Sequence, residues 1–386
     1  MATKTLLIDA TSMGEDQKGV GKYAHEVINR LDQILPNDWK ILPIVFRGSQ
    51  LRVDWSKRVF VLEVTAQSGL RLGLHTMSRL VAKHGPDILL RICDSSGKDY
   101  GVPTLTVCHD INGLITQAQR SRSSIFRRSI DYFKEYFRIL AMASSAMVIC
   151  NSSFTRQQVV KNYRIPFDRT AIGYCGVDER FYGVDRAKAA QRTKNTFGCE
   201  GYVLCFATGD TRENYETLPA VAAATKRLGL NIQYVIAGVN DNSQYIRVLE
   251  EKLREHALIK QQDYVFVPFL GSDMQQQLCD LYTAADYYLE LSLHEGFGMQ
   301  LAEAMACGTT CLGSRHSALS EVGGEFMLCI DQEDPENIAE VISLGYQRNE
   351  HLKSHGDQVQ YTQRFSWDGT AKAIAEHLIS QLEKSA

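Results

Sequence analysis

Short apolar runs alternate with amphipathic stretches along most of this 386-residue chain. Runs of this length are typical of buried strands, and apolar residues at helical spacing between them are typical of helices packed on a sheet. Strand candidates in the first half are 5–8, 40–46, 58–64, 87–92, 104–108, 147–150 and 170–174; those in the second half are 201–207, 231–238, 264–270, 287–291, 309–313 and 326–330. This alternation predicts an α/β fold built on parallel sheets with helices on both faces.

The length of the chain predicts two domains, because one ordinary domain is shorter than 386 residues. The hydrophobic fraction of 44%, charged fraction of 23% and net charge of −3 are those of a soluble globular protein and argue against a nucleic-acid binder. The N-terminus shows no signal-peptide pattern, and no apolar run reaches the length of a transmembrane helix. We therefore expect a cytoplasmic protein.

The ten cysteines are scattered and form no CxxC pair. Cys307 and Cys311 are closest together, and no histidine or second pair accompanies them at zinc-ligand spacing. Reduced, buried thiols are the favoured interpretation.

The turn after the strand candidate 287–291 is the strongest candidate for a ligand site. A polar segment, Ser292–Gly298, leads into a helix expected from Met299 to about Cys307. Gly296 and Gly298 allow close approach of the backbone to a ligand, and the free amides at the helix start favour an anion.

Two carboxylates, Glu295 and Glu303, flank the same helix start. A carboxylate is a poor partner for an anion and a good acceptor for sugar hydroxyls. The turn therefore suits a molecule that carries both phosphate and hydroxyl groups, such as a nucleotide sugar. The alternative is an ordinary strand–turn–helix unit whose glycines only make the turn.

The first half offers two further candidates. Gly19 and Gly21 lie between a strand and a helix, as in a Rossmann-like unit, but Glu26 stands beyond the position of the third glycine in GxGxxG, so an NAD site is weakly supported. The glycines alternatively serve only the turn. His109 and Asp110 follow the strand 104–108, and ligands of parallel sheets bind beyond the carboxyl ends of the strands. Such a pair is also common as a structural feature.

The segment HEGFGMQLAEAMACGT resembles EGFGLPxLEAMACGxP of the retaining glycosyltransferases of family 4, also called group 1. The resemblance implies the GT-B architecture, in which two Rossmann-like domains with parallel sheets face each other across a cleft. It also implies transfer of a hexose or related sugar from a nucleoside-diphosphate sugar to an acceptor hydroxyl, with retention at the anomeric carbon. Leu291 and Gln300 stand where relatives have proline.

The same resemblance assigns roles to individual residues. Glu295 would contact the donor sugar and act at the catalytic centre, Glu303 would hold the ribose, and the backbone of Gly296, Phe297, Gly298 and Met299 would meet the sugar and the pyrophosphate. Gly19 and Gly21 would face the donor phosphates. PTLTVCHDINGL resembles PxVxTVHD, so His109 and Asp110 would lie beside the anomeric centre. Phe269 and Leu270 would lie along the base.

The loop TGDTRENYE departs from the family at the residue that matters most for charge. Arg212 and Asn214 match donor-binding positions, but Glu213 stands where relatives carry a lysine that neutralises the pyrophosphate. Either another cation replaces that lysine, or the donor differs, or activity is poor. No DxD motif is present, so we expect no divalent metal and no other cofactor.

YCGVDERF resembles the family's NGVDxxxF hinge and sets the expected domain boundary. We expect an acceptor-side domain over 1–180, a nucleotide-sugar domain over 181–365, a linker helix over 185–195, and a final segment 366–386 that packs back on the first domain.

Basic and aromatic residues interleave over 120–138. A core helix with a solvated basic face is one interpretation, and contact with an anionic membrane is the other. Relatives often use lipid-linked acceptors, so the expected partners are a nucleotide-sugar donor and a glycan or lipid-linked acceptor. Two other functions stay open: a GT-B epimerase or phosphorylase, and a non-catalytic sugar-nucleotide-binding subunit, which Glu213 favours.

Overall fold

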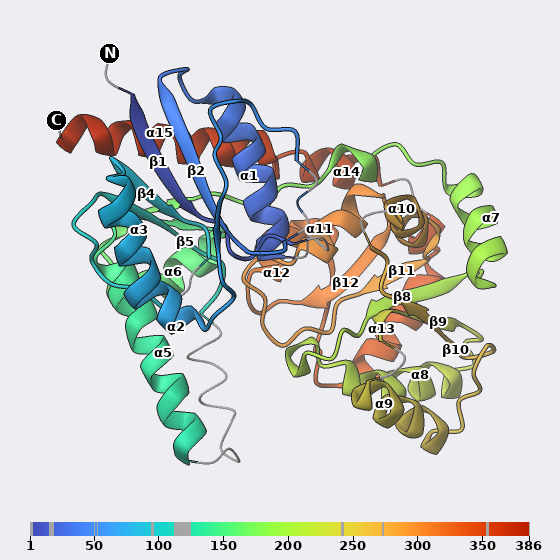
Figure 1. Ribbon diagram of the computed structural model, residues 1–386. Coiled ribbons are helices and arrows are strands. Elements are labelled where there is room, and N and C mark those ends of the chain that lie inside the picture. The colour runs from blue at the N-terminus through green and yellow to red at the C-terminus, as the bar shows by residue number, and fades with distance from the viewer. Residues whose placement is uncertain are drawn as a thin grey trace. The chain divides into compact units, whose positions relative to one another are not determined.

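The computed structural model describes residues 3–14, 19–49, 51, 53–93, 96–111, 125–240, 243–271, 274–352 and 355–385 (Figure 1), with the backbone alone described for 125–131, 211, 352 and 385. These residues form two compact units. The first comprises 1–176 and 366–386, and the second comprises 177–365.

The first unit is built on a seven-stranded, all-parallel sheet in the order β3-β2-β1-β4-β5-β6-β7. Its strands are β1 (Lys4–Asp9), β2 (Trp39–Phe46), β3 (Leu62–Val64), β4 (Ile88–Arg91), β5 (Thr104–Cys108), β6 (Met147–Cys150) and β7 (Thr170–Ile172). The central strands are buried along their length, as the continuous apolar runs predict.

The helices of the first unit are α1 (Val20–Ile34), α2 (Gly69–Arg71), a π-helical turn η1 (Leu72–Thr76), α3 (Met77–His84), α5 (Ile125–Ala143), α6 (Ser153–Tyr163) and α15 (Trp367–Ser385), with a 3-10 turn η2 (Phe167–Arg169). Local chemistry explains several of the helix starts. Ser152, for example, caps α6 by accepting a hydrogen bond from the Thr155 amide at 2.9 Å.

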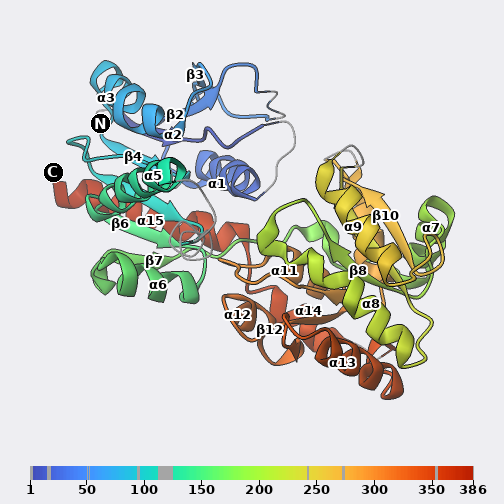
Figure 2. The same ribbon diagram turned by 90° about the horizontal axis from the view of Figure 1, so that it is seen from below.

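Helix α15, from the far end of the chain, packs against α1 (Figures 1 and 2). The rings of Tyr23 and Trp367 meet edge to face at 5.5 Å, and Arg30 pairs with Asp368. A side chain at Gly176 would lie only 2.4 Å from the Trp367 ring, so a glycine is required where the chain leaves the unit. These contacts assign 366–386 to the first unit.

The second unit is built on a six-stranded, all-parallel sheet in the order β10-β9-β8-β11-β12-β13. Its strands are β8 (Tyr202–Phe206), β9 (Gln233–Val239), β10 (Tyr264–Pro268), β11 (Tyr287–Leu289), β12 (Thr310–Ser314) and β13 (Leu328–Ile330).

The helices of the second unit are α7 (Arg186–Phe197), α8 (Leu218–Arg227), α9 (Gln244–Glu255), α10 (Gln275–Ala284), α11 (Met299–Ala306), α12 (Leu319–Gly323), α13 (Pro335–Gln347) and α14 (Gly356–Thr362). Short 3-10 turns are η3 (Glu179–Phe181), η4 (Thr211–Glu213), η5 (Tyr215–Thr217), η7 (Gly324–Phe326) and η8 (Glu350–Leu352). Helices α8 and α13 pack side by side (Figure 2). Asp334 caps α13, and Pro335 occupies its first turn.

Each unit has its own apolar core. In the first, one cluster joins β1, β2 and β4 to the helical segment 69–84 through fully buried residues such as Leu7, Ile44 and Leu89. In the second, side chains from the central strands meet α8, α9 and α13. Burying one such large apolar side chain contributes about 1.5–3 kcal/mol.

The α/β class with two parallel sheets, predicted from the sequence, is confirmed. Two details differ. The run 58–64 yields strand only over β3, because it lies at the edge of the sheet and its first half makes a single bridge, between Ile41 and Val59. Helix α7 is not a linker: it packs on α10 within the second unit, where Arg192 pairs with the nearly buried Asp280 at 2.6 Å.

Candidate functional site

The turn between β11 and α11 is tightly packed around three residues, Gly296, Phe297 and Gly298, all of which are buried. Gly298 has φ +94° and precedes the helix, and a Cβ at this position would lie 2.6 Å from Cδ2 of Leu319. The glycine is therefore required by the turn itself, whatever else it does. The N-cap position of α11 is occupied by Gly298, which has no side chain to cap the first amides of the helix.

The loop that carries Arg212 lies directly beside this turn. The Leu293 amide donates to the Arg212 carbonyl at 2.9 Å, and the Ala318 amide donates to the Glu295 carbonyl at 3.2 Å. The structure thus brings the half-buried Glu295, the segment 296–299 and Arg212 together at the carboxyl edge of the second sheet.

Arg212 meets a carboxylate that the sequence did not single out. Its Nε lies 3.0 Å from Oδ1 of Asp210, and a terminal nitrogen lies 2.5 Å from Oδ2. Both side chains are a little more than one-third exposed. The positive charge expected to meet the pyrophosphate is therefore paired within its own loop.

Glu213 closes the same loop instead of standing in for a cation. Its carboxylate accepts hydrogen bonds from the Thr208 amide at 2.7 Å and the Thr208 hydroxyl at 2.6 Å. Burial raises the pKa of Glu213, and the neighbouring carboxylates of Glu290 and Asp210 raise it further. Asn214 takes φ +52°, and its side chain donates to the Gln332 carbonyl at 2.7 Å.

Glu303 lies one and a half turns into α11 and is 7% exposed. The Tyr282 hydroxyl donates to its Oε2 at 3.3 Å. Burial raises the pKa of Tyr282, and the Glu303 carboxylate raises it further. Glu303 therefore lies in a largely enclosed position beside the helix start, held by a hydroxyl from α10.

A second buried carboxylate, Glu290, was missed. It is 5% exposed, and it accepts hydrogen bonds from the Tyr288 hydroxyl at 2.7 Å and the Ser292 amide at 3.1 Å. The hydrogen bond from the Ser292 amide to the Glu290 carboxylate holds the backbone at the start of the turn. The available signal was a charged residue inside the apolar run YYLEL.

Phe269 and Leu270 follow β10 at the same carboxyl edge. Leu270 is buried, Phe269 is half-buried, and the Phe269 amide donates to the Val239 carbonyl at 3.2 Å. This contact anchors the segment to the end of β9. Its role along a nucleotide base stays a prediction.

In the first unit, His109 follows β5 and is 9% exposed. Its Nε2 lies 2.8 Å from the Ile92 carbonyl, which can only accept, so Nε2 carries a proton and Nδ1 is the acceptor in the neutral ring. Tyr23 meets the ring edge to face at 4.9 Å, and the side-chain amide of Asn151 donates to the His109 carbonyl at 2.8 Å. Tyr23 and Asn151 were missed, because only the fold brings α1 and the end of β6 to this point.

Asp110 and the glycine loop lie at the same carboxyl edge of the first sheet. A guanidinium nitrogen of Arg138 lies 3.7 Å from Oδ1 of Asp110, and another donates to the Asp110 carbonyl at 3.0 Å. Gly19 has φ +46°, and a Cβ at Gly21 would lie 2.6 Å from the Ser12 carbonyl oxygen. The backbone conformation at Gly19 and the close contact at Gly21 therefore each favour glycine, whether or not a ligand binds there.

The stretch 120–138 is only partly described. Residues 120–124 lie outside the described residues, as do the side chains of 125–131. In the described part of α5, Tyr132 is 64% exposed, Phe133 58% and Tyr136 52%, whereas Glu135 is buried and pairs with Arg138. The exposed face is therefore aromatic, with the exposed Lys134 among the three rings.

No helix within the described ranges combines the length and apolarity needed to cross a membrane. Across those same ranges, no group of three or more His, Cys, Asp or Glu residues is arranged to hold a metal ion. The expectation that the protein needs no divalent metal stays a prediction.

Comparison with protein families and solved structures gives a consistent result. The model of Glycosyl transferases group 1 matches residues 188–360, and that of Glycosyltransferase Family 4 matches 18–181. The chain is 27% identical to the serotype-specific mannosyltransferase WbdA of Escherichia coli over 288 residues. The matched region covers 73% of this chain and 34% of WbdA. The chain thus spans about a third of the length of this relative.

A second relative, the GDP-mannose-dependent alpha-(1-6)-phosphatidylinositol dimannoside mannosyltransferase of Mycobacterium tuberculosis, is 24% identical over 292 residues, 74% of this chain and 70% of the relative. Among solved structures, sucrose-phosphate synthase from Thermosynechococcus elongatus superposes with a TM-score of 0.76 at 19% identity, covering 99% of this chain and 100% of the other. HepE from Anabaena in complex with UDP-glucose gives 0.70 at 15% identity, covering 98% and 99%. With its two parallel-sheet units, the chain therefore belongs to the GT-B glycosyltransferases of the family 4 type.

Proposed function

We propose that this chain is a retaining glycosyltransferase that moves a hexose from a nucleoside-diphosphate sugar to an acceptor hydroxyl in polysaccharide or glycolipid synthesis. Two relatives are named as mannosyltransferases, one of them GDP-mannose-dependent, so GDP-mannose is the first donor to test. A UDP-sugar is the second, because HepE was solved with UDP-glucose.

The observation that carries the proposal is the pairing of two loops at the carboxyl edge of the second sheet. The Leu293–Arg212 hydrogen bond of 2.9 Å joins a cation-bearing loop to a buried glycine turn at a helix start. Glu295 and Glu303 flank that start. Amides and a guanidinium suit a diphosphate, while carboxylates suit hydroxyls of a sugar and a ribose.

In the proposed reaction, the acceptor oxygen bonds to the anomeric carbon while the bond from that carbon to the diphosphate oxygen breaks. The nucleoside diphosphate leaves with the bonding electron pair, and a departing phosphate oxygen takes the acceptor proton. Attack from the leaving-group face gives retention. The amides of Gly298 and Met299 and the Arg212 guanidinium would stabilise the charge on the diphosphate, without a metal or other cofactor.

His109 would contact the sugar beside the anomeric centre, with Nδ1 as a hydrogen-bond acceptor, since Nε2 is committed to the Ile92 carbonyl. Tyr23 and Asn151 would act as positioning residues that hold this ring and its backbone.

A lipid-linked acceptor would agree with the exposed face of α5, defined here by Tyr132, Phe133, Tyr136 and Lys134. Aromatic side chains beside basic ones favour the interface of an anionic membrane. Co-sedimentation with vesicles containing phosphatidylglycerol tests this: replacing the three aromatic residues by serine is expected to abolish binding at low salt. Wild-type protein left in the supernatant would overturn it.

The test of the donor site is a thermal-shift titration with GDP, UDP, dTDP and ADP and their common sugar conjugates. A ligand that binds only the folded state raises the melting temperature by mass action. We expect a shift with one nucleotide that shrinks in Glu303→Gln and persists in the control Glu325→Gln, an exposed glutamate of the same unit.

Turnover assays separate the alternatives. Consumption of the donor without an acceptor would indicate an epimerase, and strict dependence on inorganic phosphate would indicate a phosphorylase. Binding without any turnover would indicate a non-catalytic subunit. The absence of any shift at millimolar nucleotide would refute the donor site.

A further inference from the structure

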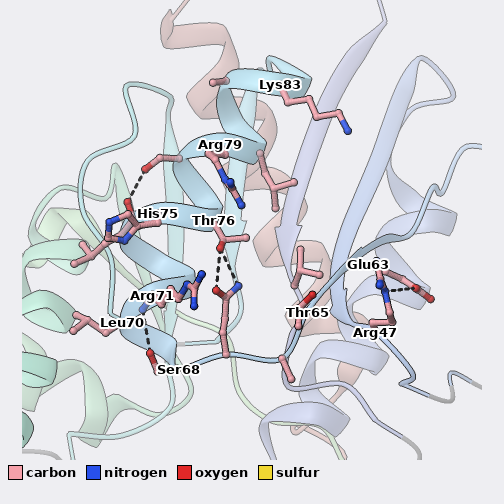
Figure 3. A pocket seen from close by; sticks show the side chains of 17 residues that line it. Arg47, Glu63, Thr65, Ser68, Leu70, Arg71, His75, Thr76, Arg79 and Lys83 are labelled. Carbon is pink, nitrogen blue, oxygen red and sulfur yellow. Dashed lines mark hydrogen bonds and ion pairs between the residues drawn. The ribbon is translucent and has the colours of Figure 1, made fainter.

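A large hollow lies on the first unit, at the carboxyl ends of β2 and β3. Its volume is about 1530 Å³, whereas pockets for drug-sized ligands are usually about 300–1,000 Å³. Figure 3 shows it between the helical segment 69–84 and the edge strand β3 with the end of β2. A space of this size suits a ligand of several sugar units.

The charge around the hollow is strongly one-sided. Its lining includes four basic residues, Arg47, Arg71, Arg79 and Lys83, while Glu63 is the one acidic residue among the lining residues that the structure describes. Glu63 lies 3.9 Å from Arg47, and both side chains are more than half exposed, so this pair is weak. On a chain whose net charge is −3, such a concentration of positive charge favours an anionic ligand.

One wall of the hollow is fixed by an irregular helix. The π-helical turn Leu72–Thr76 interrupts the helical segment 69–84, and π turns are frequent at functional sites. Tyr100 donates to the Gly73 carbonyl at 2.7 Å and Ser78 donates to the Leu74 carbonyl at 3.1 Å. A Cβ at Gly73 would lie 1.7 Å from the Ser96 carbonyl oxygen, so the turn packs directly on the next loop.

This wall presents its cations in a row. Arg71, Arg79 and Lys83 lie at spacings of eight and four residues, so they extend over about 18 Å of helix at 1.5 Å per residue. In Figure 3 these three side chains reach from the helix toward the strand side of the hollow. A row of this length matches an extended ligand with repeated negative charges better than a single phosphate.

Polar and apolar groups complete the lining. The Gln67 amide and the Thr76 hydroxyl exchange hydrogen bonds of 2.9 and 3.1 Å across the inner side. Val64 is buried, and Leu70 and Leu74 are half-buried, so the apolar lining is recessed. A bilayer binds apolar groups that project, which argues against a lipid surface here. Hydroxyl, amide and recessed apolar groups are the partners that sugar rings use.

We propose that this hollow binds an anionic saccharide, with phosphate or carboxylate groups on successive sugars, through Arg71, Arg79 and Lys83. This inference rests on the proposed function, since the saccharide would be the growing acceptor chain. Binding of the ligand's charges to exposed cations makes the affinity dependent on salt.

The test uses the full chain and isothermal titration calorimetry with two probes, pentagalacturonate and the neutral mannopentaose. We expect pentagalacturonate to bind at least about 10-fold more tightly than mannopentaose, and Arg71→Gln/Arg79→Gln to weaken it about 10-fold or more. The control Lys57→Gln/Lys161→Gln removes two exposed lysines of the same unit outside the hollow and is expected to leave the affinity within about 2-fold.

Two further arms distinguish the sources of the negative charge. Inorganic phosphate is expected to compete only weakly, and binding to phosphatidylglycerol vesicles is expected to be unchanged in Arg71→Gln/Arg79→Gln. Equal losses in the control variant, no binding of pentagalacturonate at millimolar concentration, or a loss confined to vesicles would each overturn the proposal. Nucleotide binding by the second unit is measured in parallel, so a failure of the donor site is seen separately.

Discussion

Replacing Gly298 by alanine is the sharpest test of how the turn between β11 and α11 is built. Gly298 immediately precedes α11 and has φ +94°, and the added Cβ would lie 2.6 Å from Cδ2 of the fully buried Leu319. Either α11 shifts away from α12 or the turn rearranges. Both movements displace the amides that the proposed function assigns to the diphosphate.

The expected magnitude has two parts. A non-glycine residue in the left-handed region costs about 1–2 kcal/mol, and overpacking a well-packed site costs about 1–3 kcal/mol. The second unit should therefore lose about 2–5 kcal/mol. At roughly 2–4 °C per kcal/mol for a unit of this size, its melting temperature falls by roughly 4–20 °C.

Gly308→Ala is the matched control, because Gly308 ends the same helix with φ +76° while a Cβ there would meet Val359 at an ordinary 3.7 Å. It should cost only the backbone strain, about 1–2 kcal/mol. Adding Leu319→Ala to Gly298→Ala should recover about 1–3 kcal/mol relative to additivity, since the two sites are in contact.

The assay separates the two units by their signals. All three tryptophans, Trp39, Trp55 and Trp367, belong to the first unit, so tryptophan fluorescence reports its unfolding, whereas far-ultraviolet circular dichroism reports both units. The dichroism transition of the second unit should shift while the fluorescence transition does not. Equal losses in the two alanine variants, or additivity with Leu319→Ala, would refute the argument from the Leu319 contact.

Three further predictions follow from the same loops. Burial raises the pKa of Glu213 above the ordinary value for a glutamate, so the native state loses stability as pH rises from that ordinary value through the raised pKa. Glu213→Gln should be more stable than wild type near about pH 8 and equal to it near about pH 4, and a stability difference that widens toward low pH would contradict this. Tyr282→Phe removes the hydrogen bond to Glu303, about 0.5–1.5 kcal/mol, and should weaken donor binding about 2–12-fold by calorimetry; an unchanged affinity would show that Glu303 needs no such support. Asp210→Asn weakens a partly exposed ion pair worth up to about 1 kcal/mol and should tighten donor binding up to about 5-fold by releasing Arg212, whereas weaker binding would show that Asp210 positions the guanidinium.

The sequence predicts what is decided locally. The apolar runs predicted β5 and β6 with their full bounds, and the glycine turn predicted the start of α11 at Met299. It missed Asp210, Glu290 and Tyr23, because their importance comes from partners that only the fold supplies. Tyr23 reads as one apolar position of α1, yet its ring supports His109, which is 86 positions away along the chain and lies after β5. The same limit applied to Glu213, whose partner Thr208 is set by how the loop closes.

That loop closure changes how the missing lysine is understood. Thr208 donates a hydrogen bond to Glu213, and Arg212 pairs with Asp210. Both charged side chains therefore have partners within their own loop. Burial raises the pKa of Glu213, and the carboxylates of the buried Glu290 and of Asp210 raise it further, so negative charge is already concentrated around this loop. A diphosphate at this edge would therefore depend on oriented amides at the start of α11 more than on cations. Amides held by a buried turn need no rearrangement when charge develops. The packing of Gly298 against Leu319 therefore matters more to this site than the identity of the residue at position 213.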